Sequence, residues 1–487
     1  MADLEQRLVA LEATVAKRDA VIAEQDAVIA KQDAVIAERD VTIAKLEARI
    51  TGLETKLGQN SSNSSLPPSS DRGKNPHRNA KKATAKRKKR KKRRGQGSHR
   101  ELLPPEQVDA FHDHFPAACD GCGKRLSKSP DPEPQRHQVT ELPEVRPHVD
   151  EHRLHAVACR CGCVTRGVLP EDVSRSAFGP RLTATVALLT GLYRLSKRNT
   201  GRILDELFHI DISVGAISEC ERRVGDALAA PHKELHDFVQ TEAVVHADET
   251  SWQQKHRTHW LWVACTCAVS LFVIQAKRCT DSAKHLLGED FSGTLVTDRL
   301  ASYGFWTGPR QTCWAHIKRT FQGLAEREGG ACATFGVPLL HQTREMFKLW
   351  KRVRDGTLQH RTFQRRMRPI REEIERLLEE AATSACTHTQ GKAKAILKHR
   401  DALWTYVDVE GIEPTNNEAE RALRHAVILR KLSFGTQSER GSRFIERMLS
   451  AVDTLRKQER DVLPFLMHAL HAHRTTTTPP SLVPAAA

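Results

Sequence analysis

The chain contains 487 residues, with 76 Lys and Arg against 60 Asp and Glu, so its formal net charge is +16. Fifteen Lys or Arg and no acidic residue fall between Arg72 and Arg100, and they account for all but about one unit of that excess. A block of like charge cannot be buried, because desolvation and self-repulsion cost too much. The composition therefore excludes a uniformly basic, histone-like body and predicts roughly two to four nearly neutral domains with one basic tether.

Residues 1–58 carry a seven-residue repeat that predicts a coiled coil. One heptad position is apolar throughout: Leu8, Val15, Ile22, Ile29, Ile36, Ile43, Ile50 and Leu57. Its partner position is Leu at both ends of the stretch and polar in the middle, at Arg18, Gln25, Gln32 and Arg39. An apolar period of 3.5 residues favours a left-handed coiled coil, so we expect a homo-oligomer. The alternative is one amphipathic helix that packs on the protein's own body.

Residues 59–100 are predicted to be a disordered linker that contains the basic block. Ser, Asn and Pro supply no core, and Pro67-Pro68 blocks a helix. A solvated cluster of Lys and Arg is expected to add sequence-independent DNA affinity that depends steeply on salt. The candidate DNA contacts in the block are Lys88, Lys89, Arg90, Arg93 and Arg94.

The sequence has no run of 18 apolar residues, which predicts a protein without a membrane span. The residues that follow Met1 also lack the basic-then-apolar order of a signal peptide. Both features favour a reducing cytoplasm, where the 12 Cys are better interpreted as thiols or metal ligands than as disulfides.

Residues 101–175 are predicted to form a small zinc-binding domain. Cys119-Asp-Gly-Cys122-Gly places two thiols on a tight turn, and Cys159-Arg-Cys161-Gly-Cys163 follows later in the chain. Four thiolates satisfy a structural Zn²⁺ ion, and the expected set is Cys119, Cys122, Cys159 and Cys161, with Cys163 as the spare. The alternative is that these are free buried thiols.

Residues 176–235 are predicted to be a helical, DNA-binding region. Helical patterns cover residues 181–192, 199–208 and 214–228. The short break before the last of them, with Ser213 as a candidate N-cap, has helix–turn–helix spacing. Any helical hairpin would show the same pattern.

From residue 241 the pattern changes to short β-rich segments. Strands are expected at residues 243–247, 259–264, 270–274 and 293–297, with a helix over residues 278–287. After about Thr312 the pattern is helical again to roughly Val407. The Thr- and Pro-rich residues from Thr475 onward are expected to be disordered.

Two aspartates stand where apolar runs stop. Asp248 follows Val244-Val-His-Ala and Asp298 follows Thr294-Leu-Val-Thr. Two such strands side by side would bring carboxylates together, and these would repel unless a cation such as Mg²⁺ lay between them. A third acid, Glu420, begins an amphipathic helix, and three acids around two Mg²⁺ ions suit phosphodiester chemistry. An Asp at a strand end is also typical of a turn, and Glu420 of a solvated helix face.

These motifs, taken in chain order, resemble those of bacterial insertion-sequence transposases of the IS-sixty-six type, a DDE transposase family. The resemblance covers most of the chain, beginning with the heptads, the linker, the basic block and the Cys pairs. It continues through Val245-His-Ala-Asp248-Glu-Thr250, Thr297-Asp298-Arg-Leu-Ala-Ser-Tyr303, Cys313-Trp-Ala-His316, Asn416-Asn-Glu-Ala-Glu420-Arg and Arg430-Lys431 before Phe434-Gly435.

The resemblance implies a multidomain α+β protein with a ribonuclease-H-like α/β catalytic core in residues 236–465. The core would contain a long helical insertion at about 320–412, and residues 466–487 would be a C-terminal tail. Asp248, Asp298 and Glu420 would be the catalytic, magnesium-binding triad, and the spacing of 122 positions from Asp298 to Glu420 fits the insertion. The family often has Asp-Asn-Asn where this chain has Thr415-Asn416-Asn417, a departure outside the triad. The nearest rival acids, Glu249 and Glu418, are expected to point away from the metals.

The resemblance also implies an activity and its partners. A Mg²⁺-dependent DNA transposase would cut insertion-sequence ends and join them to target DNA by two-metal hydrolysis and strand transfer. It would be a bacterial, nucleoid-associated protein that could need accessory transposition proteins. Candidate phosphate contacts are Arg421, Arg424, Arg430 and Lys431, for which ordinary solvated helix charge is the alternative. Two other functions remain open: a non-catalytic zinc and helix–turn–helix DNA-binding factor derived from a transposase, and an RNA-processing nuclease.

Overall fold

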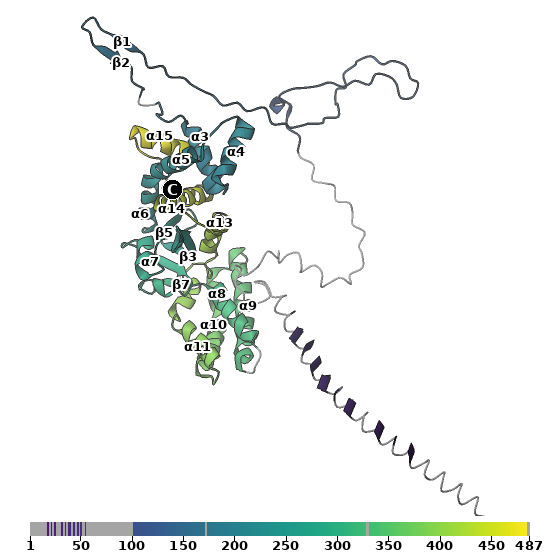
Figure 1. Ribbon diagram of the computed structural model, residues 1–487. Coiled ribbons are helices and arrows are strands. Elements are labelled where there is room, and N and C mark those ends of the chain that lie inside the picture. Colours follow the sequence, from purple (N-terminus) through teal and green to yellow (C-terminus); the bar gives the residue numbers. More distant parts are fainter. Residues whose placement is uncertain are drawn as a thin grey trace, which may run out of the picture. The chain divides into compact units, whose positions relative to one another are not determined.

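The computed structural model describes residues 101–170, 173–327 and 331–484, together with isolated residues between Lys17 and Glu54 (Figure 1). The chain divides into two compact units. Cys313–Gly411 belongs to the first, which we call the helical unit, and Lys82–Thr312 with Ile412–Ala487 forms the second, which we call the sheet unit.

The predictions for residues 1–100 fall almost entirely outside the described residues. The isolated positions between Lys17 and Glu54 are helical and exposed. The linker and the basic block, including Lys88, Lys89, Arg90, Arg93 and Arg94, are not among the described residues. Within the described part of the chain, no helix combines the length and the apolar character needed to cross a membrane.

The sheet unit is built on a mixed five-stranded sheet, so the predicted mixture of α and β structure is confirmed. In spatial order the strands are β5 (Ser270–Gln275), β4 (Arg257–Cys265), β3 (Val244–Gln254), β6 (Thr294–Thr297) and β7 (Arg310–Thr312). The pairs β5–β4 and β4–β3 are antiparallel, whereas β3–β6 and β6–β7 are parallel. The side chains of Trp252 and Trp262 are fully buried in the core of this sheet.

Strand β3 is longer than the sequence predicts. The expected strand ends at Ala247, but β3 continues to Gln254 and pairs with β4 as a hairpin. The turn consists of Lys255 and His256, which both have positive φ values, of 48° and 64°. Such a turn matches the twist of paired strands, but it is usually made by Asn and Gly. The Lys-His pair therefore does not predict a turn at this position.

Helix α14 (Glu439–Lys457) covers the outer edge of β5 through a stripe of polar side chains. Three of them lie four residues apart and accept hydrogen bonds from alternate backbone N–H groups of β5. The bonds are Ser270 N to Thr454 Oγ1 (3.0 Å), Phe272 N to Ser450 Oγ (2.8 Å) and Ile274 N to Glu446 Oε2 (2.9 Å). The spacing works because residues four apart share a helix face and alternate strand residues share an edge.

The sheet unit also contains further helices. In chain order they are α3 (Pro180–Ala187), the π-helical turn η3 (Leu188–Leu192), α4 (Lys197–Phe208), α5 (Val214–Ala227), α6 (Ala229–Val239), α7 (Thr280–Leu287), α13 (Asn417–Ser433) and α15 (Val462–Thr475). Helices α3, α5 and α15 pack against one another (Figure 1). Residues 476–484, after α15, are not a disordered tail as predicted, because Leu482 is buried and its carbonyl accepts a 2.8 Å hydrogen bond from Gln458 Nε2.

The helical unit contains α8 (Trp314–Ala325), α9 (Ala331–Arg354), α10 (His360–Thr383), α11 (Thr387–Leu397), the 3₁₀ turn η5 (Asp401–Leu403) and α12 (Thr405–Asp408). Its core includes an aromatic cluster of Trp350, Phe363 and Tyr406, whose ring centroids lie 5.6–6.0 Å apart. Trp314 Nε1 donates a 2.7 Å hydrogen bond to the carbonyl of Leu403, which ties α8 to η5. The sequence predicts a helical insertion at about residues 320–412, and the helical unit covers Cys313–Gly411.

Residues 101–170 contain little regular structure beyond a 3₁₀ turn, η2 (Pro105–Gln107), and a two-stranded hairpin of β1 (Ala156–Ala158) and β2 (Val164–Arg166). Most of their side chains are exposed, and no residue of this segment is in the buried core. A segment this poor in buried apolar surface needs another source of stability, such as a bound metal.

Candidate functional site

The register of two parallel strands places Asp248 and Asp298 at the same level of the sheet. Residues Val244, Val245 and His246 of β3 face Thr294, Leu295 and Val296 of β6. Asp248 lies two residues beyond the last of these pairs on one strand, and Asp298 two residues beyond it on the other. Neighbouring strands are separated by about 4.8 Å, so the two carboxylates emerge side by side.

Asp298 lies in the loop that directly follows β6, and backbone hydrogen bonds shape this loop. Its Oδ1 accepts a 2.7 Å hydrogen bond from the backbone N–H of Leu300, and the Thr297 hydroxyl donates to its carbonyl at 2.9 Å. The Arg310 guanidinium also donates to the Asp298 carbonyl, at 3.3 Å. These bonds fix the direction in which the carboxylate leaves the strand end.

Asp248 is an internal residue of β3, which corrects the expectation that it ends its strand. It stands where the shorter neighbour β6 has already stopped, while β4 still pairs with the other side of β3. Its Oδ1 accepts a 2.9 Å hydrogen bond from the backbone N–H of Glu249. Pairing with β4 therefore holds the backbone of Asp248 in place, on the side of β3 where β6 has ended.

Asn416 attaches the start of α13 to β3. Its Nδ2 donates a 2.8 Å hydrogen bond to the Ala247 carbonyl, and its Oδ1 lies 3.2 Å from Nδ1 of His246. Asn416 is 1% exposed, so these bonds are made in the interior. Because Glu420 lies one helical turn later, this attachment brings the third acid to the same part of β3 as Asp248.

The other end of α13 is attached to β3 as well. Arg430 Nη1 donates to Thr250 Oγ1 at 3.1 Å and to Ser251 Oγ at 2.6 Å. After the helix ends, Thr436 N donates to the Gln253 carbonyl at 2.9 Å. Helix α13 is thus fixed along β3 at both ends, and the position of Glu420 follows from those attachments.

The electrostatics show that these acids share one neighbourhood. Burial raises the pKa of Asp248 well above its usual value, and the negative charges of Glu249, Asp298 and Glu420 raise it further. Carboxylates that raise one another's pKa values destabilise the charged form, and a bound cation removes that penalty. Their hard oxygen ligands are the type that Mg²⁺ prefers.

The two rival acids are held by ion pairs. Arg278 lies 2.5 Å from Glu249, and the Tyr303 hydroxyl donates to the other oxygen of Glu249 at 3.2 Å. Burial raises the pKa of Glu249, as does the Asp298 charge, whereas Arg278 lowers it. Glu418 pairs with Lys457 at 3.0 Å and also with Arg421.

The candidate phosphate contacts on α13 have different environments. Arg430 is used to hold the helix to β3, as described above, and Arg421 is paired with Glu418. Arg424 and Lys431 are exposed. The sequence does not predict that Arg430 binds β3, because the charge pattern of a helix does not show which of its faces lies against a sheet.

The helix–turn–helix segment has the predicted local structure. Helices α4 and α5 are separated by residues 209–213, and the Ser213 side chain accepts a 3.2 Å hydrogen bond from the Ala216 N–H, as expected for an N-cap. His209 ends α4 in the left-handed conformation, with a φ value of 53°. The break is therefore a true turn between two capped helices.

The cysteines form two similar turns. In the first, the Cys119 N–H donates to Lys124 O at 2.9 Å, and Gly123 has a φ value of +72°. In the second, the Cys159 N–H donates to Cys163 O at 2.7 Å, and the φ value of Gly162 is +89°. Among the described residues, the sulfurs of the two turns do not gather into a group of three or more within 4.8 Å, so the zinc site remains a prediction.

Backbone amides favour the thiolate form in both turns. Hydrogen bonds from the amides of Gly121 and Cys122 lower the pKa of Cys119, and a hydrogen bond from the Cys163 amide contributes most to lowering the pKa of Cys161. A thiolate is the form that binds a metal.

The sequence pattern does not predict the position of the Asn416 side chain. This residue lies in the Asn416-Asn-Glu-Ala-Glu420 motif, directly before a helix, where an Asn side chain is usually expected to cap the helix. Here its side chain makes no cap and bonds to β3 instead. No local pattern distinguishes these two uses, because the partner strand lies about 170 residues earlier.

Two protein-family models match parts of this sequence. A family model described as "Transposase IS66 family" matches residues 175–443. Residues 16–101 match a "Family of unknown function (DUF6444)". A curated protein of Sinorhizobium fredii (strain NBRC 101917 / NGR234), "Uncharacterized protein y4qI", is 28% identical over 203 residues, which are 39% of this chain and 37% of that protein. The chain thus matches a little over a third of the length of that relative.

Proposed function

Because the chain belongs to the IS66 transposase family, we propose that it cuts DNA at the ends of an insertion sequence and joins those ends to target DNA. The observation that supports this proposal is that three acids lie in one neighbourhood of the sheet unit, although among the described residues their carboxylate oxygens do not all lie within 4.8 Å of one another. Asp248 and Asp298 stand at one level of two parallel strands, and α13 carries Glu420 to the same neighbourhood.

We propose that the sheet is the ribonuclease-H-like core of a DDE enzyme. The order β5-β4-β3-β6-β7, with three antiparallel strands followed by two parallel ones, supports this assignment. Strands β3 and β6 are the central parallel pair, and parallel strands run in the same direction. Asp248 lies at the level where β6 stops, and Asp298 follows the end of β6.

The residues present fit a divalent cation. They supply hard oxygen ligands, and burial together with neighbouring charge already opposes ionisation of Asp248. Asp248, Asp298 and Glu420 would hold the metal, while Glu249 would remain with Arg278 and Tyr303. When bound, two Mg²⁺ ions would activate the attacking oxygen and stabilise the charge on the leaving oxygen.

The chain's own residues would orient the reaction. The Glu249 and Leu300 amides hold the carboxylates of Asp248 and Asp298 in place before DNA arrives. In the cutting step, a water oxygen bonds to phosphorus and the P–O3′ bond breaks, which leaves a 5′-phosphate and a free 3′-hydroxyl. In the joining step, that 3′-oxygen bonds to a target phosphorus and displaces another 3′-oxygen. Both are in-line displacements, so one preorganised site serves both.

The remaining parts would hold DNA and assemble the protein. We propose that Cys119, Cys122, Cys159 and Cys161 bind one structural zinc ion, because each pair lies on a turn whose amides favour thiolates. The basic block, the α4–α5 pair and the exposed Arg424 and Lys431 would contact DNA phosphates. The N-terminal heptads would join copies of the chain.

The proposal is tested with labelled duplexes that carry the DNA flanking the coding sequence. Wild-type protein should nick them in Mg²⁺ but not in EDTA, and Asp248→Asn should bind them equally well without nicking. Asp281→Asn is the matched control, because Asp281 is an exposed acid on α7. Nicking by Asp248→Asn at the wild-type rate would refute the assignment. Binding without any metal-dependent nicking would favour the DNA-binding factor, and preferential cleavage of RNA would favour a ribonuclease.

A further inference from the structure

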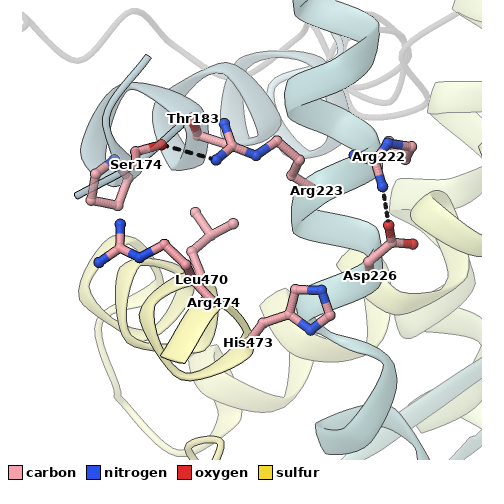
Figure 2. A pocket seen from close by; sticks show the side chains of 9 residues that line it. Ser174, Thr183, Arg222, Arg223, Asp226, Leu470, His473 and Arg474 are labelled. Atoms are coloured by element: carbon pink, nitrogen blue, oxygen red, sulfur yellow. Dashed lines mark hydrogen bonds and ion pairs between the residues drawn. The ribbon is translucent and has the colours of Figure 1, made fainter. Parts of the chain in front are cut away.

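A second polar site lies in the sheet unit, among α3, α5 and α15. It is a cavity of about 260 Å³ whose walls combine basic side chains with a few apolar ones (Figure 2). The lining residues are Ser174, Pro180, Thr183, Arg222, Arg223, Asp226, Leu470, His473 and Arg474. None of them belongs to the acidic site of β3, β6 and α13.

The cavity is lined by three arginines and by one carboxylate, that of Asp226. One of the three arginines forms ion pairs with carboxylates. Arg222 donates to Asp226 at 2.6 Å and to Glu219 at 2.8 Å, so its charge is balanced within α5. This leaves Arg223 and Arg474 without a carboxylate partner among the described residues. The cavity therefore has an excess of positive charge.

Both of these arginines have hydrogen-bond donors to spare. Arg223 Nη2 donates to Ser174 Oγ at 3.2 Å, but its buried Nη1 has no hydrogen-bond partner in the described structure. Arg474 Nη2 lies 3.2 Å from Nδ1 of His471, and its buried Nε is also without a partner. Figure 2 shows the two guanidinium groups facing the cavity from opposite walls. A buried polar atom that lacks a partner is costly, and a bound anion or water is one way to satisfy it.

We propose that this cavity binds a phosphate group. A phosphate offers several acceptor oxygens and a double negative charge, which suit two guanidinium groups on opposite walls. The Ser174 hydroxyl accepts from Arg223 and keeps its own proton to donate to a further oxygen. Pro180 and Leu470 supply apolar surface for the sugar of a nucleotide.

The size of the cavity selects between kinds of ligand. At about 260 Å³ it is smaller than the pockets that enclose drug-sized molecules, which begin near 300 Å³. It suits a single phosphate with its attached sugar. The phosphate could belong to the backbone of bound DNA, since Arg222 and Arg223 lie on the second helix of the helix–turn–helix pair, or to a free mononucleotide. The proposal rests on this geometry alone and is independent of the proposed cleavage reaction.

The experiment measures phosphate binding by the full chain. Wild-type protein is titrated calorimetrically with inorganic phosphate and with deoxyadenosine monophosphate at constant ionic strength. One saturable site is expected. Arg223→Gln and Arg474→Gln should each weaken it roughly tenfold or more, because each removes a charge-assisted hydrogen bond. The matched control is Arg181→Gln, which removes the same charge from an exposed position on α3 and should bind as the wild type does.

A second measurement identifies the source of the phosphate. If the ligand is a DNA backbone phosphate, both cavity variants should lower the slope of log affinity for duplex DNA against log salt by about one unit, and free phosphate should compete. If it is a free nucleotide, DNA binding should be unchanged while mononucleotide binding is lost.

The proposal is overturned if wild-type protein binds neither inorganic phosphate nor the mononucleotide and the cavity variants bind DNA as Arg181→Gln does. Thermal melting checks that each variant folds. Arg474 lies in the last turn of α15 and is partly exposed, so Arg474→Gln keeps the test decisive if Arg223→Gln does not fold.

Discussion

The attachment of α13 to β3 by Asn416 gives a prediction that joins stability to activity. In Asn416→Ala, the Ala247 carbonyl loses its 2.8 Å donor and His246 loses its 3.2 Å partner, both in the interior. A buried carbonyl without a donor costs about 1–3 kcal/mol, and the second bond adds about 1 kcal/mol. We expect the free energy of unfolding to fall by about 2–4 kcal/mol, which a domain of ordinary stability, about 5–15 kcal/mol, survives.

The same substitution should reduce DNA cleavage by more than its effect on folding explains. Glu420 lies one turn after Asn416, so loosening the start of α13 displaces the third carboxylate. A displacement of about 1 Å at a reacting centre can cost about 100-fold in rate. We therefore expect folded Asn416→Ala protein to bind DNA normally and to nick it about 100-fold more slowly.

The assay pairs urea unfolding, followed by tryptophan fluorescence, with the Mg²⁺-dependent nicking assay. Asn417→Ala is the matched control, because the neighbouring asparagine is exposed. If Asn416→Ala and Asn417→Ala unfold at the same urea concentration and nick DNA at the same rate, the attachment does not position Glu420 and our reasoning is wrong.

Three further predictions concern other parts of the chain. Burial lowers the pKa of His232 from 6.5 to about 4, so the unfolded chain binds a proton at a higher pH than the folded chain does. The free energy of unfolding should therefore be highest above pH 6.5 and fall by about 3 kcal/mol towards pH 4. In urea titrations, His232→Gln should reduce this dependence on pH. Arg278→Met should lower the free energy of unfolding by about 2–4 kcal/mol, because it leaves the buried carboxylate of Glu249 without its cationic partner. The double variant with Glu249→Gln should recover part of that loss in thermal or urea unfolding. Metal analysis should find one zinc ion per chain in the wild type and in Cys163→Ser but none in Cys161→Ser, whereas equal loss in both would point to a different ligand set.

Much of the site could be predicted from the sequence because its two aspartates follow apolar runs. Two short runs that each end in an acid imply two strands with one shared edge, and the register of β3 and β6 agrees with this. The length of β3 could not be predicted in the same way. Its turn uses Lys255 and His256 with positive φ values, which side chains of this type rarely adopt, so only the pairing with β4 reveals it.

Features that depend on contacts between residues far apart in the chain could not be predicted from the sequence either. Leu482 is buried against the body of the sheet unit, although the Thr- and Pro-rich residues before it predict disorder. The arginines of the phosphate cavity lie near residue 223 and at residue 474, and only the packing of α5 and α15 brings them together. Composition describes a segment by itself, whereas burial depends on what the fold places beside it.

The hydrogen bonds between α14 and β5 restrict how copies of the protein can associate. An uncovered edge strand acts as a template on which a strand from another molecule can add. On β5, the backbone groups that would receive such a strand are occupied by Glu446, Ser450 and Thr454 of α14. A strand from another molecule would have to displace α14 before it could pair with β5. Continuous sheets across two molecules are therefore disfavoured at this edge, even at high protein concentration.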